Sequence, residues 1–168
     1  NAGVLTWGLS WEMSEEQFTD VIDVNLVGAW KTLRATLPTM IEARNGGSIV
    51  IVSSVAGLKA MPVQASYSAS KYGLTGLAQT VAKEVAPYRI RVNSLHPYAV
   101  NTPMGVGDAS AIEVFGNPKF TRFFPSLMDY NPIAEPDEIS DAVLYLCSDS
   151  AKSLTGVQLP IDMGHSKV

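Results

Sequence analysis

The first part of the chain carries the hydrophobic pattern of a long amphipathic helix. Apolar residues recur every three or four positions between residues 14 and 44, which is the spacing of a helix face that packs on a core. Ser14 and Gln17 have the spacing of a capping box that starts a helix. Pro38 predicts a kink, and the Gly46-Gly47 pair predicts the end. The stripe consists of Phe18, Ile22, Leu26, Ala29, Leu33, Leu37 and Met40.

The rest of the chain alternates between strand and helix patterns. The apolar run at residues 48–53 is typical of a strand buried on both faces of a parallel sheet. Further strands are expected at about 89–95 and 156–161, and helices at about 66–86 and 136–147. Strands that alternate with helices predict an α/β domain with a parallel sheet and right-handed crossovers. We therefore interpret residues 1–168 as part of one domain.

Residues 105–131 contain Gly, Pro and several aromatic residues but no clear strand pattern. Long irregular segments in compact domains are often lids or binding loops. The aromatic residues of this segment either line an apolar substrate pocket or pack the segment onto the core, and the sequence favours neither. They are Phe115, Phe120, Phe123, Phe124 and Tyr130.

Composition restricts the function classes. The chain is 46% hydrophobic and 17% charged, and its net charge of −4 argues against nucleic acid as a partner. No apolar run reaches membrane-spanning length, so we expect a cytoplasmic protein without membrane contact. The single cysteine, Cys147, is expected to be a buried thiol. His96 and His165 do not form a zinc pattern with it, and neither histidine matches Ser54 in a hydrolase triad. We therefore expect no metal.

Tyr67 and Lys71 are the strongest chemical signal in the chain. Residues four apart share one face of a helix, so the phenol and the ammonium are expected side by side. A neighbouring cation favours the phenolate and lowers the pKa of a tyrosine from about 10 toward neutrality. Ser54 directly follows the predicted strand at 48–53, where ligands bind in open α/β sheets. A solvated helix face is the alternative interpretation of the pair.

Several ordered motifs resemble the short-chain dehydrogenase/reductase family over nearly the whole chain. The resemblance implies a Rossmann-like doubly wound parallel sheet in three layers, recorded here from the end of the fourth strand onward. The matching sequences are Asn1-Ala2-Gly3, Val24-Asn25-Leu26-Val27-Gly28, Ser54, Tyr67 with Lys71, Arg91-Val92-Asn93-Ser94-Leu95-His96-Pro97, Val100-Asn101-Thr102-Pro103-Met104, Thr155-Gly156-Val157 and Ile161-Asp162-Met163-Gly164.

The resemblance assigns a catalytic role to four residues. Tyr67 would be the general acid/base, and Lys71 would lower the pKa of Tyr67 and bind the nicotinamide ribose. Ser54 would hold the substrate oxygen. Asn25 would interrupt its helix and hold a water that links Lys71 to solvent.

The same resemblance implies the binding residues. Tyr98 stands where the family commonly has glycine, and it would add a ring beside the nicotinamide pocket. The substrate would contact Ser54, Tyr67 and Tyr98. The cofactor would contact Asn1, Ala2 and Gly3 on the adenosine side, Val100 and Thr102 at the carboxamide, and also Tyr67, Lys71 and Pro97.

The finer pattern His-Pro-x-x-Val-x-Thr-Pro-Met at residues 96–104 is similar to the carveol dehydrogenase and mycofactocin-linked branch of the family. That resemblance implies an oxidoreductase that acts on a secondary alcohol or ketone, apolar or cyclic, with NAD as cofactor and NADP as the alternative. It also implies a homotetramer, paired through the helices at about 14–44 and 66–86 and through the strand at about 156–161.

One family motif does not occur in the sequence. The glycine-rich Thr-Gly-x-x-x-Gly-x-Gly turn, which binds the cofactor pyrophosphate, would stand before Asn1, and we expect roughly 80–100 preceding residues in a whole domain of this type. The second hypothesis is therefore a non-catalytic binding or scaffold protein on the same fold, or an inactive fragment.

Overall fold

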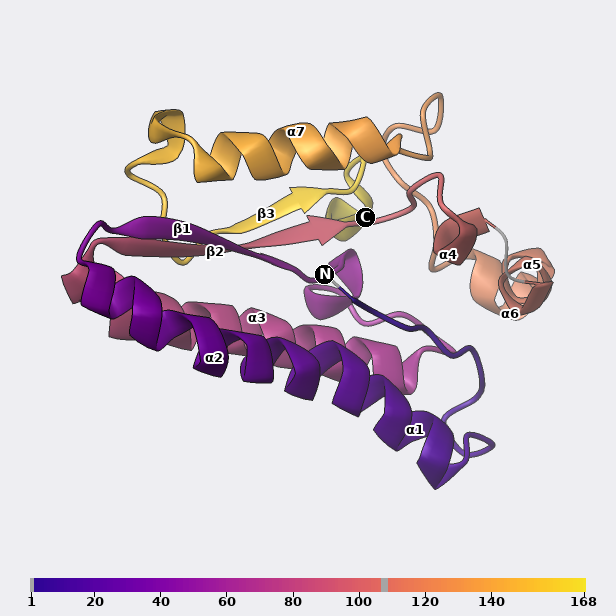
Figure 1. Cartoon of the computed structure of the whole chain (residues 1–168). Helices are drawn as coiled ribbons and strands as arrows, with labels where there is room; N and C mark the ends of the chain where they lie inside the picture. Colours follow the sequence, from indigo (N-terminus) through magenta and orange to yellow (C-terminus); the bar gives the residue numbers. More distant parts are fainter. Residues whose placement is uncertain (1, 107–108) are drawn as a thin grey trace.

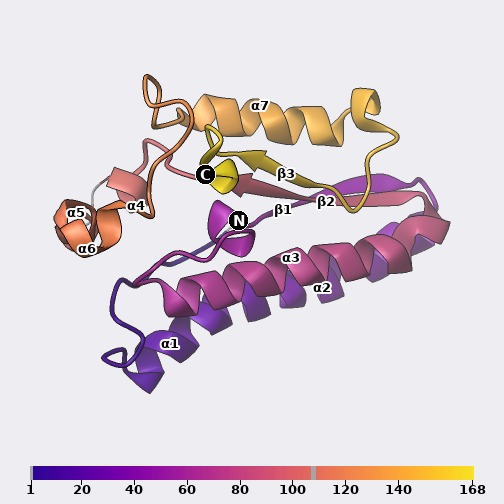
Figure 2. The same cartoon turned by 180° about the vertical axis from the view of Figure 1, so that it is seen from behind.

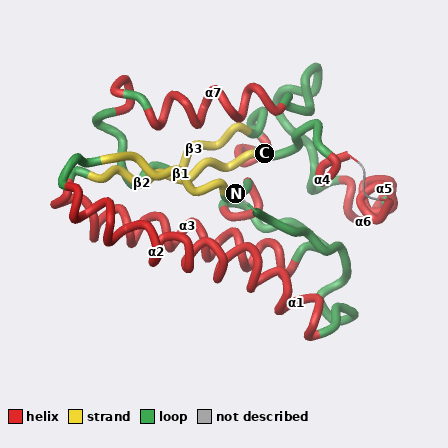
Figure 3. Tube along the Cα trace, in the orientation of Figure 1, coloured by secondary structure: helices red, strands yellow, loops and turns green. Residues whose placement is uncertain are grey.

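Three parallel strands form the central sheet of the computed structural model, which describes residues 2–106 and 109–168. They are β1 (Gly47–Val52), β2 (Ile90–Pro97) and β3 (Gln158–Ile161), in the order β1-β2-β3. Helices α2 (Gly28–Ala43) and α3 (Ala65–Val85) cover one face, and α7 (Pro136–Cys147) covers the other (Figures 1 and 2). The predicted three-layer α/β architecture is confirmed, and Figure 3 shows the sheet between its helical layers.

The first helical segment has a break that its hydrophobic pattern does not reveal. Helix α1 (Glu15–Ile22) starts at the predicted capping box, and a π-helical turn at Asp23–Val27 separates it from α2. Such a turn inserts one extra residue and shifts the phase of the helix face. Consequently Val21, rather than Ile22, is buried, and Phe18 at the start of the stripe is exposed.

The end of α2 also differs from the prediction. The helix continues through Pro38 and ends at Ala43, before the glycine pair. Arg44 takes the left-handed conformation, with φ of 54°, that normally favours glycine. Gly46 and Gly47 both have positive φ, and the chain passes close to other residues there, just before β1. A Cβ on Gly46 would meet the backbone oxygen of Arg89, and one on Gly47 would meet the side chain of Met40.

The core lies between α2, α3 and the sheet. Helix α3 supplies most of the buried apolar side chains, and a 3₁₀ turn at Ala86–Tyr88 leads from it into β2. Helix α7 has the predicted bounds, but Leu146 is its buried residue and Cys147 is exposed, so the expected buried thiol is wrong. The core residues are Leu33, Ile51, Leu74, Ala78, Val81, Ala82, Val85, Ile90 and Val92.

The segment expected to be irregular contains three short helices. They are α4 (Pro103–Val106), α5 (Ala109–Gly116) and α6 (Pro118–Thr121), and they lie beyond the carboxyl ends of the strands (Figure 1). Asn117 caps α6 by accepting a hydrogen bond from the backbone N–H of Lys119 at 3.0 Å. The Asn-Pro sequence at residues 117–118 is therefore a sequence signal for the start of a helix.

Helix α3 approaches the chain after β1 very closely at Gly57. A Cβ atom on Gly57 would lie 2.6 Å from the backbone oxygen of Lys71 and 2.7 Å from Ser53 Oγ. Ser53 Oγ donates a hydrogen bond to the same Lys71 oxygen at 2.9 Å, and Thr75 Oγ1 contacts the Gly57 oxygen at 3.2 Å. This contact fixes the first turns of α3 against the end of β1.

We expect Gly57→Ala to lower the free energy of unfolding by about 1–3 kcal/mol, because the added methyl group meets backbone that cannot yield without moving α3. Gly76→Ala is the matched control on α3, since a Cβ there meets nothing within 4 Å. Removal of a helical glycine should stabilise the protein by about 0.5–1 kcal/mol. Urea unfolding of both variants in the natural-length protein checks the pair, and equal effects would contradict the close-contact argument.

Candidate active site

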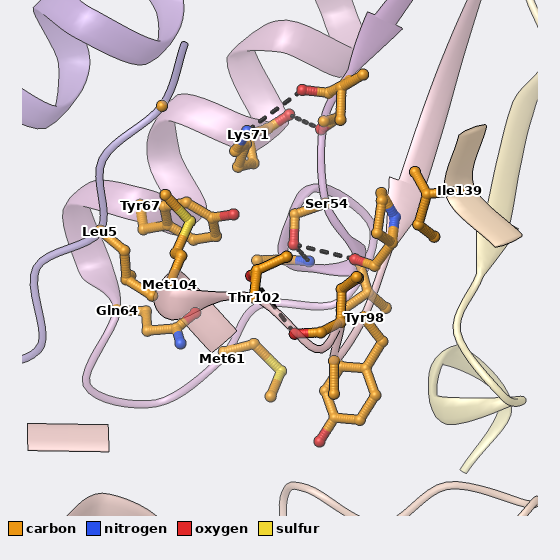
Figure 4. Close-up of a pocket in the computed structure, with 18 of the residues that line it drawn as sticks. Leu5, Ser54, Met61, Gln64, Tyr67, Lys71, Tyr98, Thr102, Met104 and Ile139 are labelled. Atoms are coloured by element: carbon orange, nitrogen blue, oxygen red, sulfur yellow. Dashed lines mark hydrogen bonds between the residues drawn. The ribbon is translucent and has the colours of Figure 1, made fainter. Parts of the chain in front are cut away.

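Most of the predicted site residues line one pocket at the carboxyl end of the sheet. The pocket has a volume of about 570 Å³ and lies between the ends of β1 and β2, the start of α3 and the segment 97–104 (Figure 4). Asn25 and Ala2 are not on its wall, and Asn1 lies outside the described residues. The predicted residues that line it are Gly3, Ser54, Tyr67, Lys71, Pro97, Tyr98, Val100 and Thr102.

Ser54 is held in place by the turn that it caps. Its Oγ accepts a hydrogen bond from the N–H of Ala56 at 3.1 Å and donates one to the oxygen of Pro97 at 3.4 Å. Its backbone conformation is extended, which lets the side chain cap the 3₁₀ turn at Val55–Gly57. The hydroxyl is therefore positioned at the pocket wall before any ligand binds.

His96 holds the backbone of Ser54 through a hydrogen bond, a role that the sequence did not reveal. The ring is fully buried, with Nδ1 2.8 Å from the backbone oxygen of Ser54 and Nε2 2.8 Å from Ser94 Oγ. Burial lowers the pKa of His96, with the charge of Lys71 acting in the same direction. The neutral ring donates from Nδ1 to Ser54 and accepts from Ser94 at Nε2, so both ring nitrogens are satisfied.

Tyr67 and Lys71 occupy the first turns of α3, one turn apart. Lys71 Nζ lies 5.2 Å from the centre of the Tyr67 ring and donates a hydrogen bond to the oxygen of Val52 at 3.3 Å. Burial lowers the pKa of Lys71 to about 8. The predicted side-by-side arrangement is therefore present, in a site that disfavours charge.

The expected lowering of the Tyr67 pKa is wrong for the chain without a bound nucleotide. Burial raises the pKa of Tyr67 above its ordinary value, and a hydrogen bond with Ser54 acts in the opposite direction without reversing the shift. Loss of water stabilisation penalises the phenolate, and the ammonium of Lys71 faces the ring of Tyr67. The protonated tyrosine is therefore the stable form in this structure.

Asn25 lies in the π-helical turn, where it ties two distant segments together. Its Oδ1 accepts from the N–H of Val4 at 2.8 Å, and its Nδ2 donates to the oxygen of Val4 at 2.9 Å and to Ser70 Oγ at 3.0 Å. Ser70 Oγ in turn donates to the oxygen of Tyr67 at 2.7 Å. Asn25 thus fastens the segment after Gly3 to α3, and the predicted water link stays a prediction.

Tyr98 joins the pocket wall to the segment that covers it. Its hydroxyl donates to the oxygen of Phe124 at 2.7 Å, and its ring stacks on His165 with centroids 4.0 Å apart. Burial raises the pKa of Tyr98 to about 12, so the hydroxyl remains a donor. Of the five aromatic residues in the covering segment, Phe115 and Phe124 line the pocket, in edge-to-face contact at 4.6 Å.

Several pocket residues were not predicted as site residues. They come from the N-terminal segment, the loop before α3, helix α4 and the start of α7, and only the fold brings them together. Met104 alone stood in a family motif, the Thr-Pro-Met end of the pattern at residues 96–104. The missed residues include Leu5, Trp7, Met61, Gln64, Met104 and Ile139.

Two other site types find no support in the part of the chain that the structure describes. Within residues 2–106 and 109–168, no group of three or more His, Cys, Asp or Glu side chains is arranged to hold a metal ion. Over the same residues, each helix is too short or too polar to cross a membrane.

Comparison with known proteins identifies the family. The sequence model of a family described as enoyl-(acyl carrier protein) reductase matches residues 1–166. An uncharacterized NAD-dependent oxidoreductase of Mycobacterium tuberculosis is 50% identical over 99% of this chain and 61% of its own length. The (-)-trans-carveol dehydrogenase of Rhodococcus erythropolis is 38% identical over 98% of the chain and 62% of its own length.

The fold comparison agrees. A short-chain dehydrogenase from Mycobacterium paratuberculosis, solved with NAD bound, superposes with a TM-score of 0.93 and 41% identity. The match covers 100% of this chain and 63% of that protein. The chain belongs to the short-chain dehydrogenase/reductase family and spans about three fifths of the length of these relatives.

We expect Lys71→Met to stabilise the fold at neutral pH in the absence of nucleotide. Because burial lowers the pKa of Lys71 to about 8 from 10.5, the unfolded chain binds the proton more tightly. The penalty is complete below pH 8 and disappears as pH rises to about 10.5. The variant should gain on the order of 2–3 kcal/mol at pH 7, less the lost contact with Val52, and this gain should shrink with rising pH.

Lys83→Met is the control, because Lys83 is exposed in the last turn of the same helix. Its effect should stay within about 0.5 kcal/mol at every pH. Denaturant unfolding of both variants between pH 7 and pH 10 supplies the comparison. A Lys71→Met variant that is less stable than wild type at pH 7 would show that burial of the ammonium does not destabilise the fold.

Proposed function

We propose that the protein transfers a hydride between NAD and a secondary alcohol or ketone. The observation that carries this proposal is the convergence of Ser54, Tyr67 and Lys71 on one pocket wall at the carboxyl end of the sheet. Hydroxyl, phenol and ammonium together can hold a carbinol oxygen and exchange its proton. The NAD-dependent relatives support the same reaction class.

The residues present fit the nicotinamide-ribose half of the cofactor. Lys71 Nζ donates one hydrogen bond among the described residues, to Val52, so two of its N–H groups remain for ribose hydroxyls. Gly3 lines the pocket edge, where Asn25 holds the following segment through Val4. NADP is the alternative nucleotide.

Each cofactor contact is proposed from this placement. Tyr67 and Lys71 would hold the ribose, and the segment after β2 would hold the carboxamide; the adenosine side would meet the start of the chain. When bound, the cofactor supplies the hydride acceptor of the oxidation. The residues involved are Ala2, Gly3, Tyr67, Lys71, Pro97, Val100 and Thr102, with Asn1 at the chain start.

Residues of this chain would bind the substrate oxygen and transfer the alcohol proton. Ser54 donates a hydrogen bond to the substrate oxygen in place of its long 3.4 Å contact with Pro97. Tyr67 takes the alcohol proton during oxidation and returns a proton during reduction. Lys71, with its pKa near 8, is mostly charged at neutral pH. It stabilises the Tyr67 phenolate, which accepts the alcohol proton in oxidation and is left behind when Tyr67 donates its proton in reduction.

The substrate side of the pocket is apolar. Leu5, Met61 and Met104 line it (Figure 4). Trp7 and Phe115 also belong to the pocket lining. Such a wall suits a cyclic or terpenoid-like alcohol, which the resemblance to a carveol dehydrogenase also favours. Tyr98 would contribute its ring to substrate binding.

A homotetramer remains part of the proposal. Phe18, Trp30 and Tyr72 are large apolar residues that are exposed on the outer helical layer. Two of them lie on the segment from α1 to α2 and one on α3, the elements expected to pair between subunits. Burial against a second copy would remove this apolar surface from water.

We expect Tyr67→Phe to lower kcat by about 10²–10⁴-fold, because the variant keeps the ring and loses the proton-exchanging hydroxyl. Tyr72→Phe is the matched control. It lies on the same helix, and its hydroxyl donates to the oxygen of Leu58 at 2.7 Å outside the pocket. NAD reduction by the natural-length protein with a secondary alcohol supplies the rate. Undiminished turnover by Tyr67→Phe would refute the mechanism, and NAD binding without turnover in wild type would favour the scaffold alternative.

A further inference from the structure

Gln64 carries a side-chain amide on the pocket wall. Gln64 is 6% exposed and lies on the pocket wall. Its backbone oxygen accepts from the N–H of Ser68 at 2.8 Å, but its amide makes no hydrogen bond with the residues that the structure describes. The amide nitrogen and oxygen are not among the fully enclosed polar atoms that lack a partner, so they are accessible from the pocket. An unpaired amide on a pocket wall is therefore a group that a ligand can satisfy.

Gln64 is placed beside the reacting group. It immediately precedes α3 as the N-cap residue and stands three residues before Tyr67, and both residues line the pocket. Figure 4 shows the amide between Leu5 and Met61, on the side of the pocket that also carries Tyr67. A molecule whose carbinol oxygen meets Tyr67 can reach Gln64 with a second group.

The surroundings determine the charge of that second group. Leu5, Met61 and Met104 make this part of the wall apolar, and Lys71 is the cationic side chain among the lining residues. Lys71 is engaged with Val52 and the Tyr67 ring, and its remaining N–H groups are assigned to the nicotinamide ribose, so it is not available to a carboxylate at the Gln64 end. A primary amide donates from nitrogen and accepts at oxygen, which suits a neutral hydroxyl or carbonyl oxygen.

We propose that Gln64 is a specificity-determining residue that binds a second, uncharged oxygen of a cyclic secondary alcohol or ketone. This inference rests on the proposed function, because it assigns the reacting oxygen to Tyr67 and Ser54. It narrows the substrate class from apolar alcohols in general to those that carry an additional hydroxyl or carbonyl group on the hydrocarbon frame.

The test compares alcohols that differ in one oxygen. The natural-length protein is assayed with NAD and cyclohexanol, 1,3-cyclohexanediol, 1,4-cyclohexanediol or 4-hydroxycyclohexanecarboxylate. For the wild type, kcat/KM with the better diol should exceed that with cyclohexanol by about tenfold, the effect of one additional buried hydrogen bond. The value of kcat/KM should be lower with 4-hydroxycyclohexanecarboxylate than with the better diol, because the carboxylate charge would be buried without a cation.

Gln64→Met is the informative variant, because it keeps the side-chain length and removes both hydrogen-bonding atoms. The ratio of kcat/KM for diol over cyclohexanol should fall about tenfold. Gln79→Met is the matched control, because it makes the same substitution at an exposed position of α3 outside the pocket lining, and it should leave that ratio unaltered. An unchanged ratio in Gln64→Met, equal use of diol and cyclohexanol by wild type, or a preference for the carboxylate would each overturn the proposal.

A binding measurement separates this inference from the proposed reaction. Calorimetric titration of the protein with the diol and with cyclohexanol should show the same preference, lost in Gln64→Met. If wild type oxidises none of these alcohols but binds the diol about tenfold more tightly, the hydride-transfer function fails and the Gln64 site stands. If oxidation proceeds without any diol preference in rate or binding, the Gln64 site fails alone.

Discussion

The contact between helix α3 and the chain after β1 at Gly57 is the constraint on which the site depends. The Lys71 backbone oxygen lies so close to Gly57 that there is no room for a Cβ atom, and Ser53 bonds the same oxygen. This lock places the first turns of α3 against the carboxyl end of β1. Tyr67 and Lys71 can therefore face Ser54 without any adjustment of the backbone, as a preorganised site requires.

Burial then determines the electrostatics of the site. It raises the pKa of Tyr67 and lowers that of Lys71 to about 8, so each group is driven toward its neutral form. Burial disfavours a phenolate in the pocket, and the nearby ammonium of Lys71 and the hydrogen bond with Ser54 compensate for part of that cost. The His96 ring, itself neutral and fully hydrogen-bonded, fixes the Ser54 backbone without adding a competing charge.

The sequence predicted what depends on local periodicity and on motif spacing. The bounds of α7 and the approach of Tyr67, Lys71 and Ser54 are of this kind. It did not predict the shift from Ile22 to Val21, because the π-helical turn contains Asn25, whose partners Val4 and Ser70 are distant in the sequence. The predicted lowering of the Tyr67 pKa was wrong for a related reason, since the desolvation that raises this pKa follows from the packed pocket and not from the four-residue spacing to Lys71. Gln64 and Met61 carry no motif, and only the fold places them on the pocket wall.

Direct hydride transfer is the central claim, and isotope labelling tests it most directly. The natural-length protein would be incubated with NAD and a cyclic secondary alcohol that carries deuterium on the carbinol carbon, and the reduced nucleotide would be examined by proton NMR. The account predicts one deuterium at carbon 4 of the nicotinamide and a slower rate than with the unlabelled alcohol. Reduced nucleotide without deuterium, or deuterium released into water, would contradict it.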